Sequence, residues 1–259
     1  MIDYARISKM VEYQKTNIWP LNMPRPGETE YPVFRRGTRG WEYPWVLEQL
    51  SELPAGSSIL DCGCGRSGFV IELNRRGFNP TGIDMFVGEE ATKGYGLTKS
   101  YAERLKGKAS FVDGNIHDIP LPDNTFDAVT CISVMEHIVI ANSEDPAYHL
   151  KCLDEMKRVL KPDGLLVCTY DTILNRKVVY GERERWGDDG WNYIKDIEHL
   201  GMPRKDPSSR IYSMEDIMLD EDAFFVPPDL YLLHGYGSGF DQFGSYHRLT
   251  SVGFALVKT

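Results

Sequence analysis

The stretch SILDCGCGRSG, residues 58–68, decides which fold the rest of the chain suggests. It starts with an apolar run typical of a buried strand, passes through Asp61 into three closely spaced glycines, and leads into apolar residues at helical spacing. We therefore expect a strand, a tight glycine turn and the N-terminus of a helix. Such a turn lets a ligand approach the backbone, and the first N–H groups of the helix present partial positive charge. A polar, nucleotide-like ligand is expected at this turn.

The glycine spacing fits two classes of cofactor site. Gly63, Gly65 and Gly68, with Asp84 about 20 residues further on, meet the dinucleotide-binding pattern. They equally meet the binding loop of S-adenosylmethionine enzymes, and a glycine turn also serves plain chain reversal. Asp61 favours the second class, because a carboxylate at the strand end would repel a pyrophosphate and attract the ammonium of a methionine group.

The composition predicts a soluble globular protein with one domain and elaborations. The chain has 259 residues, of which 12% are aromatic and 26% charged. Its net charge of −9 disfavours nucleic acid as a partner, because phosphate backbones are anionic. The residues near the N-terminus hold no apolar stretch long enough for a leader or a membrane anchor, so we expect a cytoplasmic protein without membrane contact. The oligomeric state, monomer or homodimer, stays open.

The five cysteines suit reduced thiols that act as small apolar side chains. Their number is odd, and three of them fall in or beside expected buried strands. Cys62 and Cys64 have the spacing of a metal pair, but no second pair of cysteines or histidines lies near them in the sequence. We therefore predict no metal site at these cysteines. Metal dependence of the activity stays open, because His137, Asp171 and His199 or His234 could approach one another.

Strands and helices alternate with short loops from residue 58 to residue 171. We expect strands at 58–62, 78–84, 109–113, 126–132 and 165–170, with helices at 67–76, within 88–108 and at 145–160. This alternation predicts an α/β fold, a doubly wound and mostly parallel sheet with helices on both faces. Ligands of such sheets bind beyond the carboxyl ends of the strands. Polar residues are expected at five of these ends: Asp61, Asp84, Asp113, Ser133 and Asp171.

The flanking segments are expected to elaborate this core. Residues 1–40 would form an N-terminal cap, in which Tyr4 and Ile7 begin an amphipathic helix and a proline-rich loop follows. Residues 41–259 would form the main domain, with a first helix at 41–50 and a final strand that ends at residue 257. An insertion at about 172–220 breaks the alternation, and shorter extended segments are expected at 223–226 and 230–233. Both the cap and the insertion are either lids over the site or segments packed outside it.

Several motifs, in order along the chain, resemble those of the class I S-adenosylmethionine-dependent methyltransferases, and most closely the methyltransferase type 11 group. The matching segments are the glycine motif at 59–65, the acidic strand end at 82–85, the adenine loop at 113–116, the fourth-strand motif at 126–137 and the approach to strand five at 158–164. The resemblance covers about residues 57–171. It implies a Rossmann-like methyltransferase fold with a seven-stranded sheet, and S-adenosyl-L-methionine as the cofactor.

The resemblance also implies roles for the matching residues. Asp61 and the backbone of Gly63 and Gly65 would hold the methionine moiety, while Asp84 would accept hydrogen bonds from both ribose hydroxyls. The adenine would be contacted by Met85, Asp113, Asn115 and Ile116, and the sulfonium side by main-chain atoms of Cys131 or Ile132.

Methyl transfer mainly needs a nucleophile aligned with the methyl group and, for a hydroxyl acceptor, removal of its proton. His137 follows the fourth strand and titrates near neutrality, so it is the first candidate for the base. Sugar O-methyltransferases of the family place a histidine in this region and an acid at the end of strand five, which here is Asp171. In the alternative interpretation, Glu136 and His137 only cap the following helix.

The expected function is methyl transfer to a small molecule, most often to a hydroxyl of a sugar, a natural product or a quinone-like compound. N- and C-methylation stay open, as does the identity of the acceptor. A nicotinamide-dependent oxidoreductase is the first rival, disfavoured by Asp61 and by the lack of a recognisable second catalytic domain. A cofactor-binding module without catalysis is the second rival, and the presence of every expected cofactor residue argues weakly against it.

Overall fold

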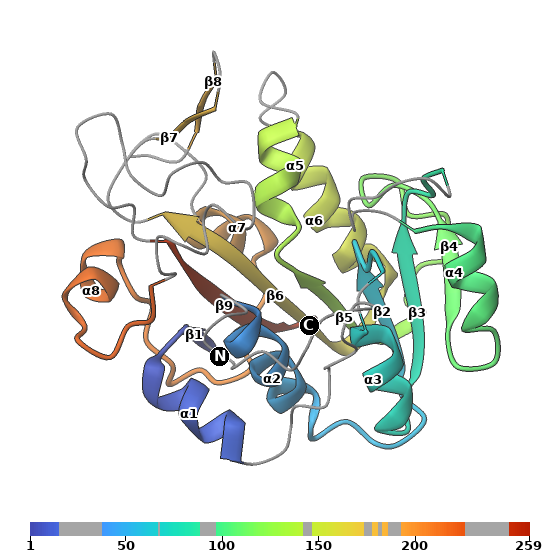
Figure 1. Ribbon diagram of the computed structural model, residues 1–259, viewed down its shortest axis with the longest axis horizontal. Helices are drawn as coiled ribbons and strands as arrows, with labels where there is room; N and C mark the ends of the chain where they lie inside the picture. Colours follow the sequence, from blue (N-terminus) through green and yellow to red (C-terminus); the bar gives the residue numbers. More distant parts are fainter. Residues whose placement is uncertain are drawn as a thin grey trace, which may run out of the picture.

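The computed structural model describes residues 1–15, 38–66, 68–88, 97–141, 147–173, 178–180, 183–185, 193–225 and 249–259. These residues form one central sheet with helices on both faces (Figure 1). The proline-rich loop predicted before residue 40 and the extended segment predicted at 230–233 lie outside the described residues.

The sheet has seven strands in the order β1-β9-β6-β5-β2-β3-β4. They are β1 (Ile2–Tyr4), β2 (Ser58–Cys62), β3 (Asn79–Asp84), β4 (Ser110–Asp113), β5 (Phe126–Ile132), β6 (Leu160–Ile173) and β9 (Leu249–Val257). The five strands from β6 to β4 are parallel, whereas β9 runs antiparallel to β6 and β1 runs antiparallel to β9. The predicted α/β fold with a mostly parallel, seven-stranded sheet is confirmed.

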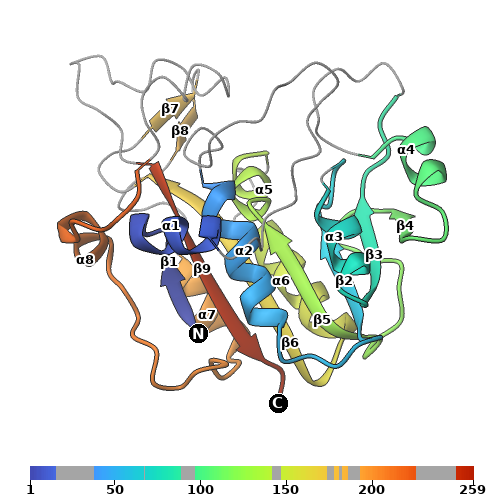
Figure 2. The same ribbon diagram turned by 60° about the horizontal axis from the view of Figure 1, so that its bottom comes forward.

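Helices cover the two faces of the sheet, because each parallel crossover must pass over one face or the other. Figure 2 shows α1 (Ile7–Lys15), α2 (Arg39–Leu50) and α3 (Phe69–Arg75) on one face and α6 (Tyr148–Val159) and α7 (Tyr193–Leu200) on the other. The remaining helices are α4 (Lys99–Arg104), α5 (Met135–Ala141) and α8 (Met214–Leu219), and β7 (Val178–Tyr180) pairs with β8 (Arg183–Arg185) apart from the main sheet.

The core is apolar on both sides of the sheet, as strands covered on both faces require. Along β2, Ile59 packs in the layer beneath α2 and α3, whereas Leu60 and Cys62 pack in the layer beneath α6. Helix α6 buries one face at helical spacing, which includes Leu153 and Met156. One apolar layer on each face thus fixes the sheet, whose strand ends position the site.

The N-terminal residues differ from the prediction. Tyr4 lies in β1 opposite Val252 of β9, and the helix begins only at Ile7. A strand of three residues is too short for its alternation to be told from helical spacing. Residues 2–4 therefore extend the sheet, while the domain boundary at residue 40 stays a prediction.

Other element bounds also differ from the expected ones. Strand β6 is longer than the predicted segment 165–170, since it starts at Leu160, opposite Phe126 and before a β-bulge. Helix α5 was not predicted as a separate element, and α7 and α8 lie in the segment predicted as an insertion. Among the described helices, none is both long and apolar enough to cross a membrane.

The contact between α2 and β9 gives a test of this packing. A Cβ added to Gly253 would lie 2.6 Å from Cζ3 of Trp45, a buried side chain of α2. We expect Gly253→Ala to lower the free energy of unfolding by about 1–3 kcal/mol, measured by urea denaturation, because the tryptophan must move. Trp45→Leu makes room, so the same glycine substitution should be less destabilising in that background. Equal effects in both backgrounds would contradict the proposed clash.

Candidate active site

The carboxyl ends of the parallel strands meet at one edge of the sheet, and the predicted polar residues lie there. Asp84 ends β3 directly opposite Asp113, the last residue of β4. Asp61 lies one residue before the end of β2, opposite Thr130 of β5. Asp171 lies near the end of β6. The topology thus brings acids from four strands to the edge where α/β folds bind their ligands.

The turn after β2 depends on glycine at two positions. Gly63 and Gly65 have φ values of +70° and +51°, in the left-handed region that favours glycine. A Cβ on Gly63 would lie 2.5 Å from Cγ2 of Val134, in the turn after β5. Gly68 has a φ of −75°, so this third glycine of the pattern is not needed for backbone conformation. The glycine loop therefore packs directly on the turn between β5 and α5.

Asp84 is held by this loop. Its Oδ2 accepts a hydrogen bond from the Gly65 N–H at 2.8 Å, and its Oδ1 accepts one from the Met85 N–H at 2.8 Å. Burial raises its pKa, while these two backbone donors act in the opposite direction. Each carboxylate oxygen keeps a further acceptor position, so the geometry is suited to the two vicinal hydroxyls of a ribose.

Asp61 is buried behind the same loop, with 3% of its surface exposed. Its Oδ1 accepts a hydrogen bond from the Thr130 hydroxyl at 2.7 Å. Burial raises its pKa to about 7, and the negative charge of Asp84 acts in the same direction. A bound cation would stabilise the ionised form of such an acid. This position therefore suits an ammonium group and disfavours a pyrophosphate.

The residues predicted to surround adenine lie beyond β3 and β4. Asp113 Oδ1 accepts a hydrogen bond from the Phe86 N–H at 3.0 Å. Met85 is 58% exposed, and its Sδ lies 3.9 Å from Nδ2 of Asn115. The side chain of Ile116 is buried in the core, which leaves its main chain for a ligand.

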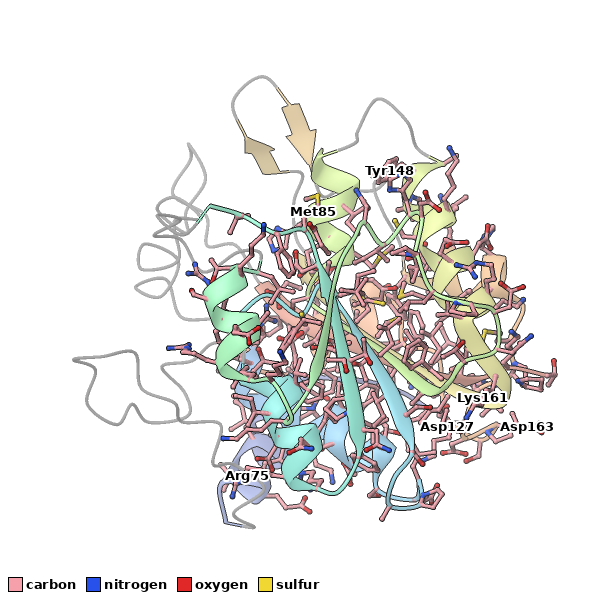
Figure 3. The ribbon with its side chains drawn as sticks, turned by 90° about the vertical axis from the view of Figure 1, so that its right-hand side faces the viewer. Arg75, Met85, Asp127, Tyr148, Lys161 and Asp163 are labelled. Atoms are coloured by element: carbon pink, nitrogen blue, oxygen red, sulfur yellow. The ribbon has the colours of Figure 1, made fainter. Side chains whose placement is uncertain are left out.

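Tyr148 joins this group, although no pattern in the sequence marks it as a site residue. Its hydroxyl accepts a hydrogen bond from Asn115 Nδ2 at 3.1 Å and lies 2.9 Å from His117 Nδ1. Figure 3 shows Tyr148 and Met85 at the same end of the molecule. Tyr148 belongs to α6, 33 positions beyond Asn115, so only the fold could show this contact.

Cys131 and Ile132 lie inside the sheet. Cys131 stands between Cys62 of β2 and Cys168 of β6, and its thiol is fully buried. Both side chains are buried, so the predicted contribution of these two residues to the site, through their main chain, stays a prediction. The five cysteines are buried free thiols. In the described ranges, no three metal-ligating side chains gather as a metal site.

A buried acidic cluster continues the polar edge toward β6, and sequence reasoning missed its central member. Glu42 of α2 is fully buried. Its Oε1 accepts hydrogen bonds from the Ser133 hydroxyl at 2.5 Å and from the Thr169 hydroxyl at 2.6 Å. The guanidinium of Arg39 pairs with its Oε2. Glu42 falls within the apolar pattern of the helix at 41–50, where nothing local marks it as functional.

Asp171 meets Glu136 in this cluster. The Asp171 N–H lies 3.4 Å from Oε1 of Glu136, and Asp171 Oδ1 accepts a hydrogen bond from the Ser251 hydroxyl at 2.6 Å. His137 follows Glu136 in the first turn of α5 and is half-buried. The predicted pair of His137 and Asp171 as base and orienting acid stays a prediction.

Burial sets the protonation of the two acids. It raises the pKa of Asp171 to about 6, and the charge of Glu42 acts in the same direction while Arg39 opposes it. Burial also raises the pKa of Glu136 well above its usual range, with added repulsion from Asp171 and Glu42. The site therefore holds acids whose proton affinity lies far above that of exposed carboxylates.

This arrangement defines a class of protein. A mostly parallel seven-stranded sheet with an antiparallel strand beside β6, a glycine loop after β2 and an acid at the end of β3 is the arrangement of class I S-adenosylmethionine-dependent methyltransferases.

Comparison with known proteins agrees with this class. Residues 60–168 match the model of a family described as "Methyltransferase domain", the methyltransferase type 11 family. Residues 60–168, less than half of the chain, are thus similar to an S-adenosylmethionine-dependent methyltransferase domain, and S-adenosylmethionine is the cofactor that this family binds.

Individual relatives share the domain and differ in what they act on. Demethylmenaquinone methyltransferase of Bacillus licheniformis is 30% identical over 46% of this chain and 47% of its own length. The tRNA (carboxymethyluridine(34)-5-O)-methyltransferase of Arabidopsis thaliana is 28% identical over 70% of this chain and 40% of its own length. The matched segments span 26–52% of the length of the first curated relatives.

A solved structure shares the fold. Phosphoethanolamine N-methyltransferase 2 of Haemonchus contortus, in complex with S-adenosyl-L-methionine, superposes with a TM-score of 0.54 at 17% identity. The match covers 86% of this chain and 53% of that one.

The glycine loop gives a test of cofactor binding. Gly63→Ala should lower the affinity for S-adenosylhomocysteine more than tenfold in isothermal titration, because the new Cβ meets Val134 and distorts the loop. Gly107→Ala is the matched control, since Gly107 has a φ of +83° and open space at its Cβ position. That variant should carry a similar backbone strain and keep its affinity. Similar affinities in both variants would contradict a ligand site at Gly63.

Asp61 gives a test by pH. Its pKa rises from 3.8 to about 7 on folding, so the folded state keeps the proton longer and the free energy of unfolding falls as pH rises between these values. Asp61→Asn should weaken this dependence and be more stable than the wild type at pH 8, by up to a few kcal/mol. Urea denaturation at pH 5 and pH 8 measures the effect.

Asp127 supplies the control for this experiment. Its carboxylate pairs with Lys161 at 2.8 Å, and its pKa lies below its usual range despite burial, because Lys161 and Ser58 hydrogen-bond it. Figure 3 shows Asp127 and Lys161 at the end of the molecule opposite Met85. Asp127→Asn should keep the wild-type change between pH 5 and pH 8. If Asp61→Asn keeps it too, the raised pKa is wrong.

Proposed function

We propose that this chain is an S-adenosylmethionine-dependent methyltransferase that acts on a small-molecule acceptor. The observation that carries the proposal is the placement of Asp61 and Asp84 around one glycine loop. Asp61 is buried where a methionine ammonium would bind, and Asp84 is oriented by the N–H of Gly65 where a ribose would bind. The match of residues 60–168 to the methyltransferase family supports the same activity.

We infer that the acceptor presents a hydroxyl group. Support comes from the acids at the ends of β5 and β6, where Glu136 and Asp171 are buried side by side and His137 follows. Carboxyls with raised pKa values and a histidine are groups that accept a proton near neutral pH, which a hydroxyl nucleophile requires and a preformed carbanion does not.

A small molecule is favoured over RNA by charge. The chain carries 38 acidic and 29 basic residues, and its net charge of −9 repels a phosphate backbone. A quinone-like phenol or a sugar avoids this repulsion. The quinone-directed relative from Bacillus licheniformis agrees with a small-molecule acceptor, whereas the tRNA-directed relative from Arabidopsis thaliana does not.

Binding and transfer can be measured separately. Isothermal titration should give a micromolar Kd for S-adenosylhomocysteine and no binding of NAD. Methyl label from S-adenosylmethionine should then pass to at least one member of a panel made of caffeate, a short-chain demethylated hydroquinone, methyl glucoside and ethanolamine. Asp84→Asn, which keeps the side-chain volume, should bind at least tenfold more weakly because it loses a charged acceptor.

Each alternative has its own outcome. Binding of NAD without S-adenosylhomocysteine would indicate an oxidoreductase. Binding of S-adenosylhomocysteine with label transferred to no panel member and to no fraction of a cell extract would indicate a module without catalysis. Transfer to ethanolamine in place of the hydroxyl compounds would overturn the hydroxyl assignment and leave the methyltransferase assignment in place.

A further inference from the structure

Glu136 has an oxygen that the described structure leaves without a partner. Its side chain is 2% exposed, and Oε1 approaches the Asp171 N–H at 3.4 Å. Oε2 is buried and meets no hydrogen-bond donor among the described residues. An unpaired buried carboxylate oxygen is costly, so its presence beside a candidate site points to a donor that arrives with a ligand.

The position of Glu136 places that donor next to the cofactor loop. Glu136 stands two residues after Val134, whose Cγ2 lies 2.5 Å from the Cβ position of Gly63. The same turn begins with Ser133, which has a φ of +48° and donates its hydroxyl hydrogen to Glu42. The glycine loop on one side and Glu42 on the other thus fix where α5 starts and where its first turn lies.

The groups around Glu136 carry more negative than positive charge. Asp171 and Tyr170 of β6, Glu42 and Arg39 of α2, and Cys131 of β5 all interact with it electrostatically. Arg39 forms an ion pair with Glu42 and also acts to lower the pKa of Glu136 and of Asp171, so one cation faces three acids. The pair of Glu136 and Asp171 holds a proton readily and releases it when a positive charge comes near.

We propose that Glu136 is the catalytic base of this site and that its Oε2 accepts the proton of the acceptor hydroxyl, with Asp171 as its positioning partner. This assignment rests on the proposed methyltransferase function and differs from the prediction that His137 takes the proton. The geometry gives the reason, because it is Glu136 that touches Asp171 and presents a buried, unpaired acceptor atom.

The step balances without a further reactant. S-adenosylmethionine supplies the methyl group on a sulfonium cation. The acceptor oxygen forms the new bond to the methyl carbon, its proton passes to the Glu136 carboxylate, and the electron pair of the broken carbon–sulfur bond stays on sulfur. The negative charge of the ionised acid and the positive charge of the sulfonium are both neutralised, which favours the reaction in a buried site.

Sinefungin tests this placement without any acceptor. It carries an amine where S-adenosylmethionine carries the methylated sulfonium, whereas S-adenosylhomocysteine has a neutral sulfur there. If Glu136 faces the transferred group, Glu136→Gln should weaken sinefungin binding about tenfold in isothermal titration and leave the Kd of S-adenosylhomocysteine within twofold. His137→Gln should change neither affinity by more than twofold.

Glu72 provides the matched control. It is a buried glutamate, but Arg75 and Arg76 both pair with it at 3.0 Å, so its charge is compensated within α3. Glu72→Gln should leave the ratio of the two affinities unchanged. Circular dichroism of each variant checks that the fold is kept.

Turnover supplies the second readout, with the panel compound that the wild type methylates. Glu136→Gln should lower kcat at least 100-fold with little change in KM, because a general base contributes about 10²–10⁴-fold. The rise of kcat/KM with pH on the acid side should be lost in Glu136→Gln and kept in His137→Gln. Asp171→Asn should shift the pH at which kcat/KM rises, since Glu136 and Asp171 titrate together.

The outcomes separate the two proposals. Wild-type protein that binds neither S-adenosylhomocysteine nor sinefungin would refute the methyltransferase function itself. With binding intact, a Glu136→Gln variant that binds sinefungin like the wild type, or that keeps more than a tenth of its turnover, would overturn the role of Glu136. If the wild type methylates no panel compound, the affinities for sinefungin and S-adenosylhomocysteine alone test the role of Glu136. Loss of turnover in His137→Gln with a functional Glu136→Gln would return the role of base to His137.

Discussion

The site depends on one fully buried carboxylate, that of Glu42. It draws Ser133 of the turn after β5 and Thr169 of β6 to a single residue of α2, and Arg39 compensates its charge. Removing one partner of such a buried group leaves an uncompensated charge or polar atom, which is strongly destabilising. Because Ser133 is held at a positive φ, the bond also fixes the start of α5 and so the position of Glu136. One ion pair thus orders the acids of the proposed acceptor side.

The alternating strands and helices of the fold could be predicted from the sequence. Parallel strands between covering helices have apolar runs long enough to recognise, and Asp61, Asp84 and Asp113 each follow such a run directly. The glycine loop carries its own signal, since Gly63 and Gly65 are required by backbone conformation and contact. These residues can be placed from the sequence because each of them lies at or just after the end of a recognisable strand.

The remaining features arise from contacts between distant segments. Strand β1 has three residues and owes its conformation to β9, which lies about 250 positions further along the chain. Tyr148 reaches Asn115 only because α6 packs against the loop that follows β4, and Glu42 reaches Thr169 across 127 positions. No periodicity or spacing carries such information, because each side chain alone is an ordinary member of its helix. Sequence reasoning accordingly found the acids at the strand ends and missed Glu42 and Tyr148, while the roles assigned to the site residues stay predictions.

The buried acids on the two sides of the site differ in their hydrogen-bond partners. On the cofactor side, the acids keep partners of their own: Thr130 bonds Asp61, and backbone N–H groups hold Asp84. In the proposed binding mode, they are preorganised for the hydrogen-bond donors that the nucleoside and the amino-acid part of the cofactor supply. On the acceptor side, Glu136 keeps one oxygen unpaired among the described residues and shares its negative environment with Asp171. An arrangement with an unpaired acceptor is stable only in its protonated form or with a ligand in place, so binding and proton transfer become linked.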